Sequence, residues 1–248
     1  MRKFIIVSIV LLICGTAGNF AQDSQFSQFF SSPLYLSPSL AGASESTRLI
    51  LNYRNQWPSL SNAYIDYAIS ADHFLSDYNS GVGILAIRNQ EGGVYNTTNL
   101  GFLYTYNIHV NRELKIRPGI KASYYMREID YNQVEFADQI TRNSGTSVEI
   151  YGNDKIRHFD FSSSVLLYTS FYWLGFTSDH MLAINPQFAG NPTYPALKST
   201  VYGGAQFKLF ESFLSKIDRT ITKAFLYKNQ AQFHHLDLGA YYEEEPFR

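Results

Sequence analysis

LGFLYTYNIHVNRELKIRPGIKASYYM, residues 100–126, alternates between two kinds of side chain. Its even positions are apolar or aromatic except for Arg112, whereas most odd positions are polar, charged or glycine. Successive side chains of a β-strand point to opposite faces of a sheet, so this period of two predicts strands with one apolar and one polar face. The pattern by itself leaves open whether the apolar face packs on a protein core or meets lipid.

The same stretch predicts a β-hairpin whose turn is formed by residues 111–113. Residues paired across an antiparallel ladder lie on the same face, so a turn with an odd number of residues pairs Val110 with Leu114 and keeps the apolar side chains together. Pro118 does not fit a regular ladder, because proline has no N–H group to donate. We therefore expect a bulge, or an interruption of the pairing, at Pro118.

Similar alternation recurs along the chain and predicts an all-β protein of about ten strands. The alternation is visible near residues 49–54, 65–72, 82–86 and 158–167, and further strands are expected near 171–178, 198–209, 220–228 and 232–242. If the first strand runs outward from the periplasm, the connections at the outer end are mostly long and those at the periplasmic end mostly short. That asymmetry is typical of outer-membrane β-barrels.

Residues 1–21 have the features of a secretory signal peptide. A positively charged start is followed by an apolar stretch that ends at Cys14 and then by small residues, and we place the cleavage after Ala21, with Gly18 as the alternative. Cys14 is the only cysteine of the chain, and it is either an ordinary residue of the apolar stretch or a lipid-modified cysteine. The mature chain then has no cysteine, which excludes disulfides and a thiol nucleophile.

Composition indicates a membrane protein without a helical span. Beyond residue 21 no apolar run approaches the roughly 18 residues that a spanning helix needs. Aromatic residues make up 16% of the chain and charged residues only 17%, whereas soluble domains carry about 25% charged residues. These features are typical of a transmembrane antiparallel β-barrel in the outer membrane, which carries aromatic girdles. We divide the chain into a signal peptide (1–21), an N-terminal non-barrel segment (22–46) and a β-barrel (47–248), and leave open whether residues 22–46 plug the barrel or lie in the periplasm.

No motif in the chain predicts catalysis. His158, Asp160 and Ser162 or Ser164 share one face of a strand, which fits a hydrolase but also the polar lining of a barrel interior. A catalytic triad needs its base within hydrogen-bond reach of the nucleophile, with a separate oxyanion site, and no GxSxG turn is present. The HExxH spacing and the glycine motifs of nucleotide-binding loops are also missing from the sequence. We expect neither an enzyme nor a metal or other cofactor.

A basic stripe follows the polar face of one predicted strand and consists of Lys115, Arg117, Lys121 and Arg127. In a barrel this face lines the lumen, where the stripe would attract an anionic solute or an acidic polypeptide segment. The alternative is that these residues form ion pairs with acidic residues of other strands and hold the wall together, for which the candidates are Asp66, Asp72 and Asp160. The residues alone leave both interpretations open.

Four stretches of the chain carry a family resemblance. QDSQFSQFFSSPLYLSPSLAG (22–42), followed by RLILNYRNQWP (48–58), resembles the opening of the PorP/SprF family of outer-membrane proteins of the type IX secretion system. WLGFTSDHMLAINP (173–186) and LYKNQAQFHHLDLGAYY (226–242) are similar to later strands of the same family. The resemblance covers nearly the whole mature chain, with departures from the family pattern at Ser24, Ser37 and His235.

The resemblance implies an outer-membrane barrel that is not an enzyme and that assists the export or surface anchoring of secreted proteins, such as gliding adhesins. Its implied partners are outer-membrane lipid, other type IX secretion components and a secreted adhesin or similar protein, without nucleic acid. A general diffusion porin with a basic lumen is the alternative function, and a soluble β-sandwich is the alternative fold.

The family continues with further strands, so we expect the chain to be incomplete at its C-terminus. Partner contact is expected at Arg54, Asn55, Gln56 and Trp57, for which an interfacial tryptophan ending a strand is the alternative.

Overall fold

The computed structural model describes residues 29–59, 63–131, 136–142, 147, 155–182, 187–188, 191–192, 196–210, 217–231 and 233–246. The predicted signal peptide, with Cys14, lies outside the described residues, as do residues 22–28 of the predicted N-terminal segment. No helix within the described ranges is long and apolar enough to cross a membrane.

One antiparallel sheet of 11 strands forms most of the described structure, which confirms the all-β prediction. The strands are β1 (Arg48–Gln56), β2 (Tyr64–Leu75), β3 (Ser80–Glu91), β4 (Tyr95–Tyr106), β5 (Ile108–His109), β6 (Lys115–Ile129), β7 (Lys155–Tyr168), β8 (Tyr172–Asp179), β11 (Lys198–Phe210), β12 (Ile217–Gln230) and β13 (Phe233–Pro246). They lie side by side in chain order, with β5 paired to β6 off the main path, and β1 and β13 are the two edges. A separate pair is formed by β9 (Gln187–Phe188) and β10 (Asn191–Pro192).

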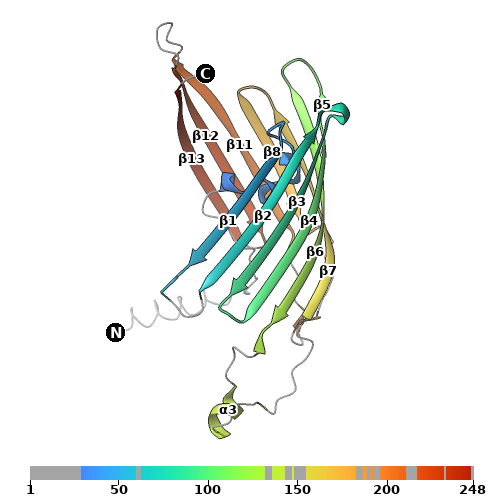
Figure 1. Cartoon of the computed structure of the whole chain (residues 1–248), viewed down its shortest axis with the longest axis vertical. Helices are drawn as coiled ribbons and strands as arrows, with labels where there is room; N and C mark the ends of the chain where they lie inside the picture. Colours follow the sequence, from blue (N-terminus) through green and yellow to red (C-terminus); the bar gives the residue numbers. More distant parts are fainter. Residues whose placement is uncertain are drawn as a thin grey trace, which may run out of the picture.

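The sheet curls, so that β11, β12 and β13 lie across the interior from β1, β2 and β3 (Figure 1). Three short helical turns lie on the concave side, namely η1 (Phe29–Ser31), α2 (Pro33–Leu36) and η2 (Pro38–Leu40). The turn between β2 and β3 contains η3 (Ser76–Tyr78), and the long connection between β6 and β7 contains α3 (Ala137–Arg142). α3 lies beyond the end of the sheet opposite to β5 (Figure 1).

The predicted hairpin register around residues 111–113 is confirmed. Val110 N donates to Leu114 O over 3.1 Å, and β5 continues the same register by pairing Ile108 with Ile116. The side chain of Asn111 caps the turn, because its Oδ1 accepts the backbone N–H of Leu114 at 2.7 Å.

Pro118 interrupts the ladder on one side only. The pairing of β4 with β6 ends at Thr105–Gly119 and resumes with β5 only at Ile108–Ile116. The register is the same on both sides of this gap, so no residue is inserted and there is no bulge. Towards β7 the pairing runs on through Pro118. Of the two expected irregularities, the interruption is therefore the one that occurs, because a residue without an N–H group leaves the ladder bond unmade.

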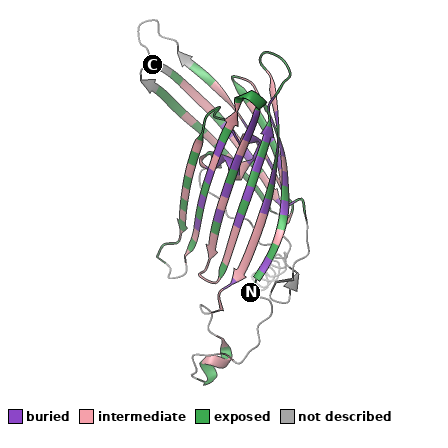
Figure 2. Cartoon of the chain, turned by 45° about the vertical axis from the view of Figure 1, so that its right-hand side comes forward, coloured by how far each residue is buried: buried purple, intermediate pink, exposed green. Residues whose placement is uncertain are grey.

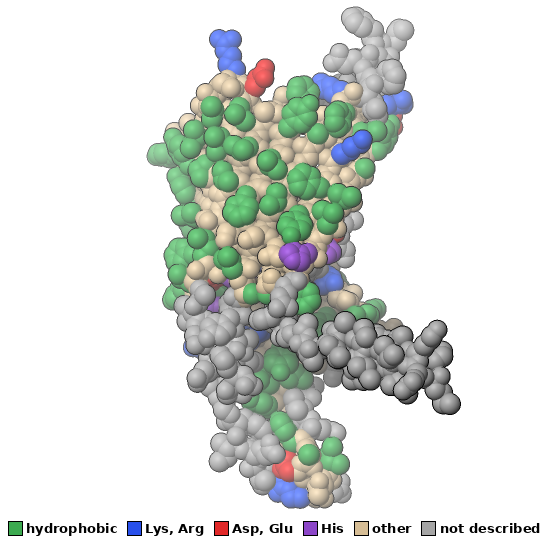
Figure 3. Space-filling view, turned by 180° about the vertical axis from the view of Figure 1, so that it is seen from behind, with side chains coloured by type: hydrophobic (Ala, Val, Ile, Leu, Met, Phe, Trp, Pro, Cys, Tyr) green, Lys and Arg blue, Asp and Glu red, His purple; other side chains and the backbone are tan. Residues whose placement is uncertain are grey.

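The two faces of the sheet have opposite character. Burial alternates along the strands, with the apolar set exposed and the polar set buried (Figure 2). Phe102 is 56% exposed and Ile120 is 55% exposed, whereas Arg117 and Lys121 are 2% and 4% exposed. Hydrophobic side chains therefore spread over the outer surface (Figure 3). A water-soluble sandwich would bury its apolar face, so this sheet is built to meet lipid on the outside.

Candidate functional site in the interior of the sheet

Residues 29–47, which we call the inner segment, lead into β1 and lie against the concave face of the sheet. Pro33 and Pro38 stand at the first positions of α2 and η2, where a missing N–H costs no intrahelical bond. The helical turns contact β3, β4, β6 and β7. On the opposite side, the Phe30 ring meets the Tyr241 ring of β13 edge-on, with centroids 4.5 Å apart. The inner segment thus bridges the two halves of the curled sheet.

Leucines anchor the inner segment to the wall. Leu34 is fully buried in a cluster made with Ala68, Leu85, Ile87 and Leu103 of the first half of the sheet. Burying a leucine side chain stabilises by about 1.5–3 kcal/mol. Leu36 and Leu40 pack against a second cluster on the other half, formed by Leu166, Tyr202 and Leu226. These apolar contacts are local exceptions on an otherwise polar inner face.

Two wall side chains accept backbone N–H groups of the inner segment. Gly42 N donates to Asp72 Oδ2 over 2.7 Å, and Ser39 N donates to Ser164 Oγ over 2.8 Å. Both contacts are buried, so each supplies a partner that solvent could not. The bonds hold main-chain atoms of the inner segment and make no use of the side chains at those positions.

The carbonyl of Ala41 is held from the opposite side by two donors. Arg117 Nη2 donates to Ala41 O at 2.5 Å, and Thr105 Oγ1 donates to the same oxygen at 3.0 Å. Arg117 is 2% exposed, and a hydrogen bond from a charged donor contributes roughly 1.5–3 kcal/mol. The carbonyl of the inner segment is therefore one of the acceptors that make burial of this guanidinium tolerable.

Glycines on the wall let the two backbones approach closely. A Cβ added at Gly81 would lie 2.8 Å from the carbonyl carbon of Ala41, and one added at Gly119 would lie 2.7 Å from Ser39 Cα. Gly42 has φ +67°, and its own added Cβ would lie 2.9 Å from Gly81 Cα. Contacts under 3.0 Å require something to shift, so glycine at these positions is a condition for seating the inner segment.

Buried ion pairs line the remaining inner face. Asp179 accepts a hydrogen bond from Lys121 Nζ over 2.9 Å, and its second carboxylate oxygen lies 3.5 Å from Lys198 Nζ. Asp160 lies 2.7 Å from Nδ1 of His180. Nearer to β1, Asp72 pairs with Arg48 at 2.9 Å and Asp66 pairs with Arg54 at 3.1 Å, and these contacts join β1 to β2. Buried charges are tolerated when they are paired and hydrogen-bonded, as these are.

The four residues of the predicted basic stripe all lie on β6, and each has an oxygen partner. Lys121 pairs with Asp179, and Arg117 donates to Ala41 O. At the two ends of the stripe the contacts are longer: Lys115 Nζ lies 3.8 Å from Glu45, and Arg127 Nη2 lies 3.9 Å from Glu91. The acids proposed as partners pair elsewhere: Asp66 with Arg54, Asp72 with Arg48 and Asp160 with His180.

The predicted contact residues at the end of β1 are divided between two environments. Arg54 and Gln56 lie on the inner side and bond to each other over 2.6 Å. Asn55 is exposed. Trp57 is 54% exposed, has φ +59°, and meets the Tyr64 ring edge-on with centroids 5.4 Å apart. The structure therefore does not bring the four side chains together.

The hydrolase candidates on β7 are not assembled for catalysis. Asp160 pairs with His180 rather than with His158, and both ring nitrogens of His158 lack a hydrogen-bond partner among the described residues. Ser164 Oγ accepts the N–H of Ser39 and so serves to hold the inner segment. Within the described ranges no group of three or more His, Cys, Asp or Glu side chains is placed to hold a metal ion.

Sequence reasoning missed several residues of the interior. His180, Asp179 and Lys198 were not singled out, because their pairings join different strands and follow no spacing within one strand. Gly119 carried a usable signal, because it is a glycine inside a predicted strand, on the polar face, and Gly81 lies next to the start of another predicted strand. Such a glycine often marks a close approach of another backbone.

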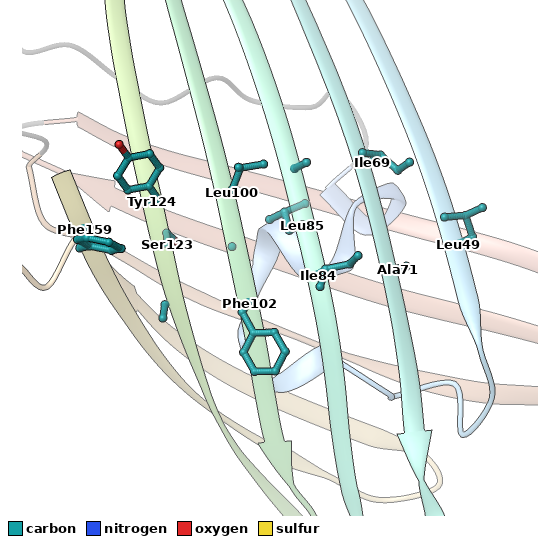
Figure 4. A pocket seen from close by; sticks show the side chains of 13 residues that line it. Leu49, Ile69, Ala71, Ile84, Leu85, Leu100, Phe102, Ser123, Tyr124 and Phe159 are labelled. Atoms are coloured by element: carbon teal, nitrogen blue, oxygen red, sulfur yellow. The ribbon is translucent and has the colours of Figure 1, made fainter. Parts of the chain in front are cut away.

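A shallow apolar groove of about 500 Å³ lies on the outer face and extends across the strands from β1 to β7 (Figure 4). Leu49, Ile69 and Phe102 project around it, and small residues such as Ala71 form part of its lining. The groove belongs to the lipid-facing surface, and its lining is almost entirely apolar apart from Ser123 and Tyr124.

Comparison with known proteins adds a family. Residues 18–247 match the family described as type IX secretion system membrane protein PorP/SprF. No curated protein and no solved structure matches the chain. The matching family is one of secretion-system membrane proteins rather than of enzymes, and its members associate with the membrane and with other type IX secretion components. The match covers nearly all of the chain and agrees with the lipid-facing sheet, so the protein is an outer-membrane member of the type IX secretion system membrane protein family PorP/SprF.

Proposed function

We propose that the protein assists the export or surface anchoring of secreted proteins, such as adhesins, and that it acts as a non-catalytic accessory and not as an open pore. Family membership supports a role in type IX secretion. The observation that carries the proposal is that the inner segment lies across the interior of the sheet and is held by the wall on both sides.

The alternative function, a general diffusion porin, needs a water-filled lumen. Two features count against it. Residues 29–47 occupy the concave side, and the cationic residues of the β6 stripe have oxygen partners. A wall whose charges are already matched has little field left to draw anions through a channel.

Protein contact is proposed at the outer end of β1. Asn55 and Trp57 are the exposed members of the four residues there, and aromatic side chains are enriched in protein interfaces. Arg54 and Gln56 would support them from the inner side, since their mutual bond and the Arg54–Asp66 pair keep the strand end in place.

The proposal is tested with a strain lacking the gene and with purified protein. The strain is expected to lose surface display of one or more secreted proteins, and the wild-type gene should restore it, whereas an Asn55→Ala/Trp57→Ala variant should restore it only in part. In planar bilayers the purified protein should give no large, steady conductance, because residues 29–47 occupy the concave side of the sheet. A steady open pore together with normal secretion in the deletion strain would favour the porin instead.

A further inference from the structure

The wall residues that hold residues 38–42 have the properties of a binding site for polypeptide main chain. We call this set the seat, and it consists of Asp72, Gly81, Thr105, Arg117, Gly119, Ser164 and Tyr202. We propose that the seat is a peptide-binding site, that residues 38–42 of the chain itself occupy it when no partner is bound, and that a turn-forming segment of the exported protein replaces them. This inference rests on the proposed function, because it needs a polypeptide partner.

Most hydrogen bonds of the seat are directed at backbone atoms, and Tyr202 adds a side-chain contact, with its hydroxyl 3.2 Å from Ser39 Oγ. Asp72 and Ser164 accept N–H groups, at 2.7 Å from Gly42 N and 2.8 Å from Ser39 N. Arg117 donates to the Ala41 carbonyl. Main-chain recognition of this kind supplies affinity without recognising particular side-chain groups.

The glycines of the seat set the class of segment that fits. Gly81 and Gly119 bring the wall backbone into contact with Ala41 and Ser39. A bulky side chain on the visiting segment at these points would meet wall backbone, which cannot move aside as a flexible side chain can. The seat therefore selects a turn-forming segment of small residues, of which the chain's own Pro-Ser-Leu-Ala-Gly at 38–42 is the example.

Arg117 favours replacement of residues 38–42 by another polypeptide over a release that leaves the seat empty. Its side chain is almost fully buried, and the Ala41 carbonyl is one of its acceptors. Removal of that carbonyl without a substitute would leave a buried cation short of a partner, which is costly. A carbonyl from an incoming segment restores the same bond, so replacement by another polypeptide is favoured over an empty seat.

The exchange needs movement of only part of the inner segment. Leu34 is held in its own apolar cluster, and β1 begins at Arg48. Residues 38–46 lie between these two fixed points and can leave the seat as a loop when Leu40 gives up its contacts with the cluster of Leu166, Tyr202 and Leu226. The rest of the inner segment stays in place.

A reversible tether tests the proposal. Ser39→Cys and Ser164→Cys introduce thiols at neighbouring positions, since Ser39 N and Ser164 Oγ are 2.8 Å apart, and the only native cysteine is Cys14. The pair is closed by oxidation or by a short reducible linker in the full-length protein. A matched control, Gln90→Cys/Asn96→Cys, bridges β3 and β4 at a wall pair away from the seat.

Cells carrying the tethered seat are expected to display the secreted protein no better than the deletion strain, and display should recover on reduction. The wall control should give equal display whether oxidised or reduced. Equal display from the oxidised and reduced Ser39→Cys/Ser164→Cys variant, at a level above that of the deletion strain, would overturn the peptide-binding seat while leaving the proposed function intact. Normal display in the deletion strain would instead remove the proposed function.

A second measurement covers the case in which the double variant is inactive in both states. The single Ser39→Cys protein in detergent is labelled with a maleimide in the presence of excess peptide LSPSLAGAS, the sequence of residues 36–44. The peptide is expected to accelerate labelling, because it displaces the thiol from the seat. A peptide with leucine at the positions of Ser39 and Ala41 should have no effect. Labelling that is equally slow with both peptides and without peptide contradicts the proposal.

Discussion

Two glycines of the wall decide how closely the inner segment can approach it. At Gly119 the neighbouring backbone of Ser39 occupies the space that any Cβ would need, and at Gly81 the same is true of Ala41. Gly101, on the same polar face of β4, is different, since an added Cβ there meets only side-chain atoms of Lys121 and Ser123 at 3.5 Å. Glycine is therefore required at Gly81 and Gly119, which face backbone atoms, but not at Gly101, which faces side chains.

Gly119→Ala is therefore expected to unseat residues 38–42 and to lower the free energy of unfolding by about 1–3 kcal/mol, the usual cost of overpacking. Gly101→Ala is the matched control and should change stability little, because the added methyl group makes ordinary contacts. Urea unfolding of both variants in detergent micelles measures the difference. Equal stability of the two variants would contradict the close packing at Gly119.

Much of the structure of the strands follows from the alternation of apolar and polar residues in the sequence. Residues 100–126 alternate so regularly that the hairpin register and the direction of each side chain follow from the sequence. The interruption beside Pro118 was also expected, since it depends on a missing N–H and not on any distant contact. The apolar face of these strands is exposed, as a lipid-facing surface requires.

An arginine at the middle of β4 tests that the outer face meets lipid. Leu100 and Val110 are both 52% exposed, but Leu100 is midway along a strand and Val110 lies at a turn. Leu100→Arg is expected to cost about 2–4 kcal/mol and Val110→Arg about 0–1 kcal/mol, because the penalty depends on depth in the bilayer. Reversible unfolding in lipid vesicles gives both values. A similar small cost at the two sites would argue that the face near Leu100 is solvated.

The molecule as a whole is apolar outside and polar inside, with a chain segment laid through its interior. Alternation and composition were sufficient to predict the outer-membrane sheet. They were not sufficient to predict that the interior is occupied, because the inner segment carries no strand period and its contacts reach both halves of the curled sheet.

The two tryptophans report on this inside-out arrangement. Trp57 is exposed at the end of β1, whereas Trp173 lies on the inner side of β8 and packs on the cluster around Leu226. Brominated lipid should quench Trp57 fluorescence in a Trp173→Phe variant and should leave Trp173 fluorescence in a Trp57→Phe variant largely unchanged. Quenching to the same extent in both variants would show that lipid reaches the inner face.

The candidate site was predictable only in part. The positions of Arg117 and Lys121 on the inner face followed from the parity of their strand. Their partners did not, since Ala41 and Asp179 come from segments that the sequence places far from β6. The hydrolase interpretation is not supported for the same reason. Strand parity places His158 and Asp160 on one face, but in the folded structure Asp160 pairs with His180.

The amino-acid sequence alone determined the strands, their register around residues 111–113, the apolar outer face and the family, because each depends on local periodicity, on composition or on a contiguous motif. Only the tertiary structure decided that residues 29–47 lie inside the sheet and which charges meet there. Those outcomes depend on the curvature of the sheet, which brings β11, β12 and β13 opposite β1, β2 and β3 (Figure 1). Curvature is a property of all the strands together, so no single stretch of sequence records it.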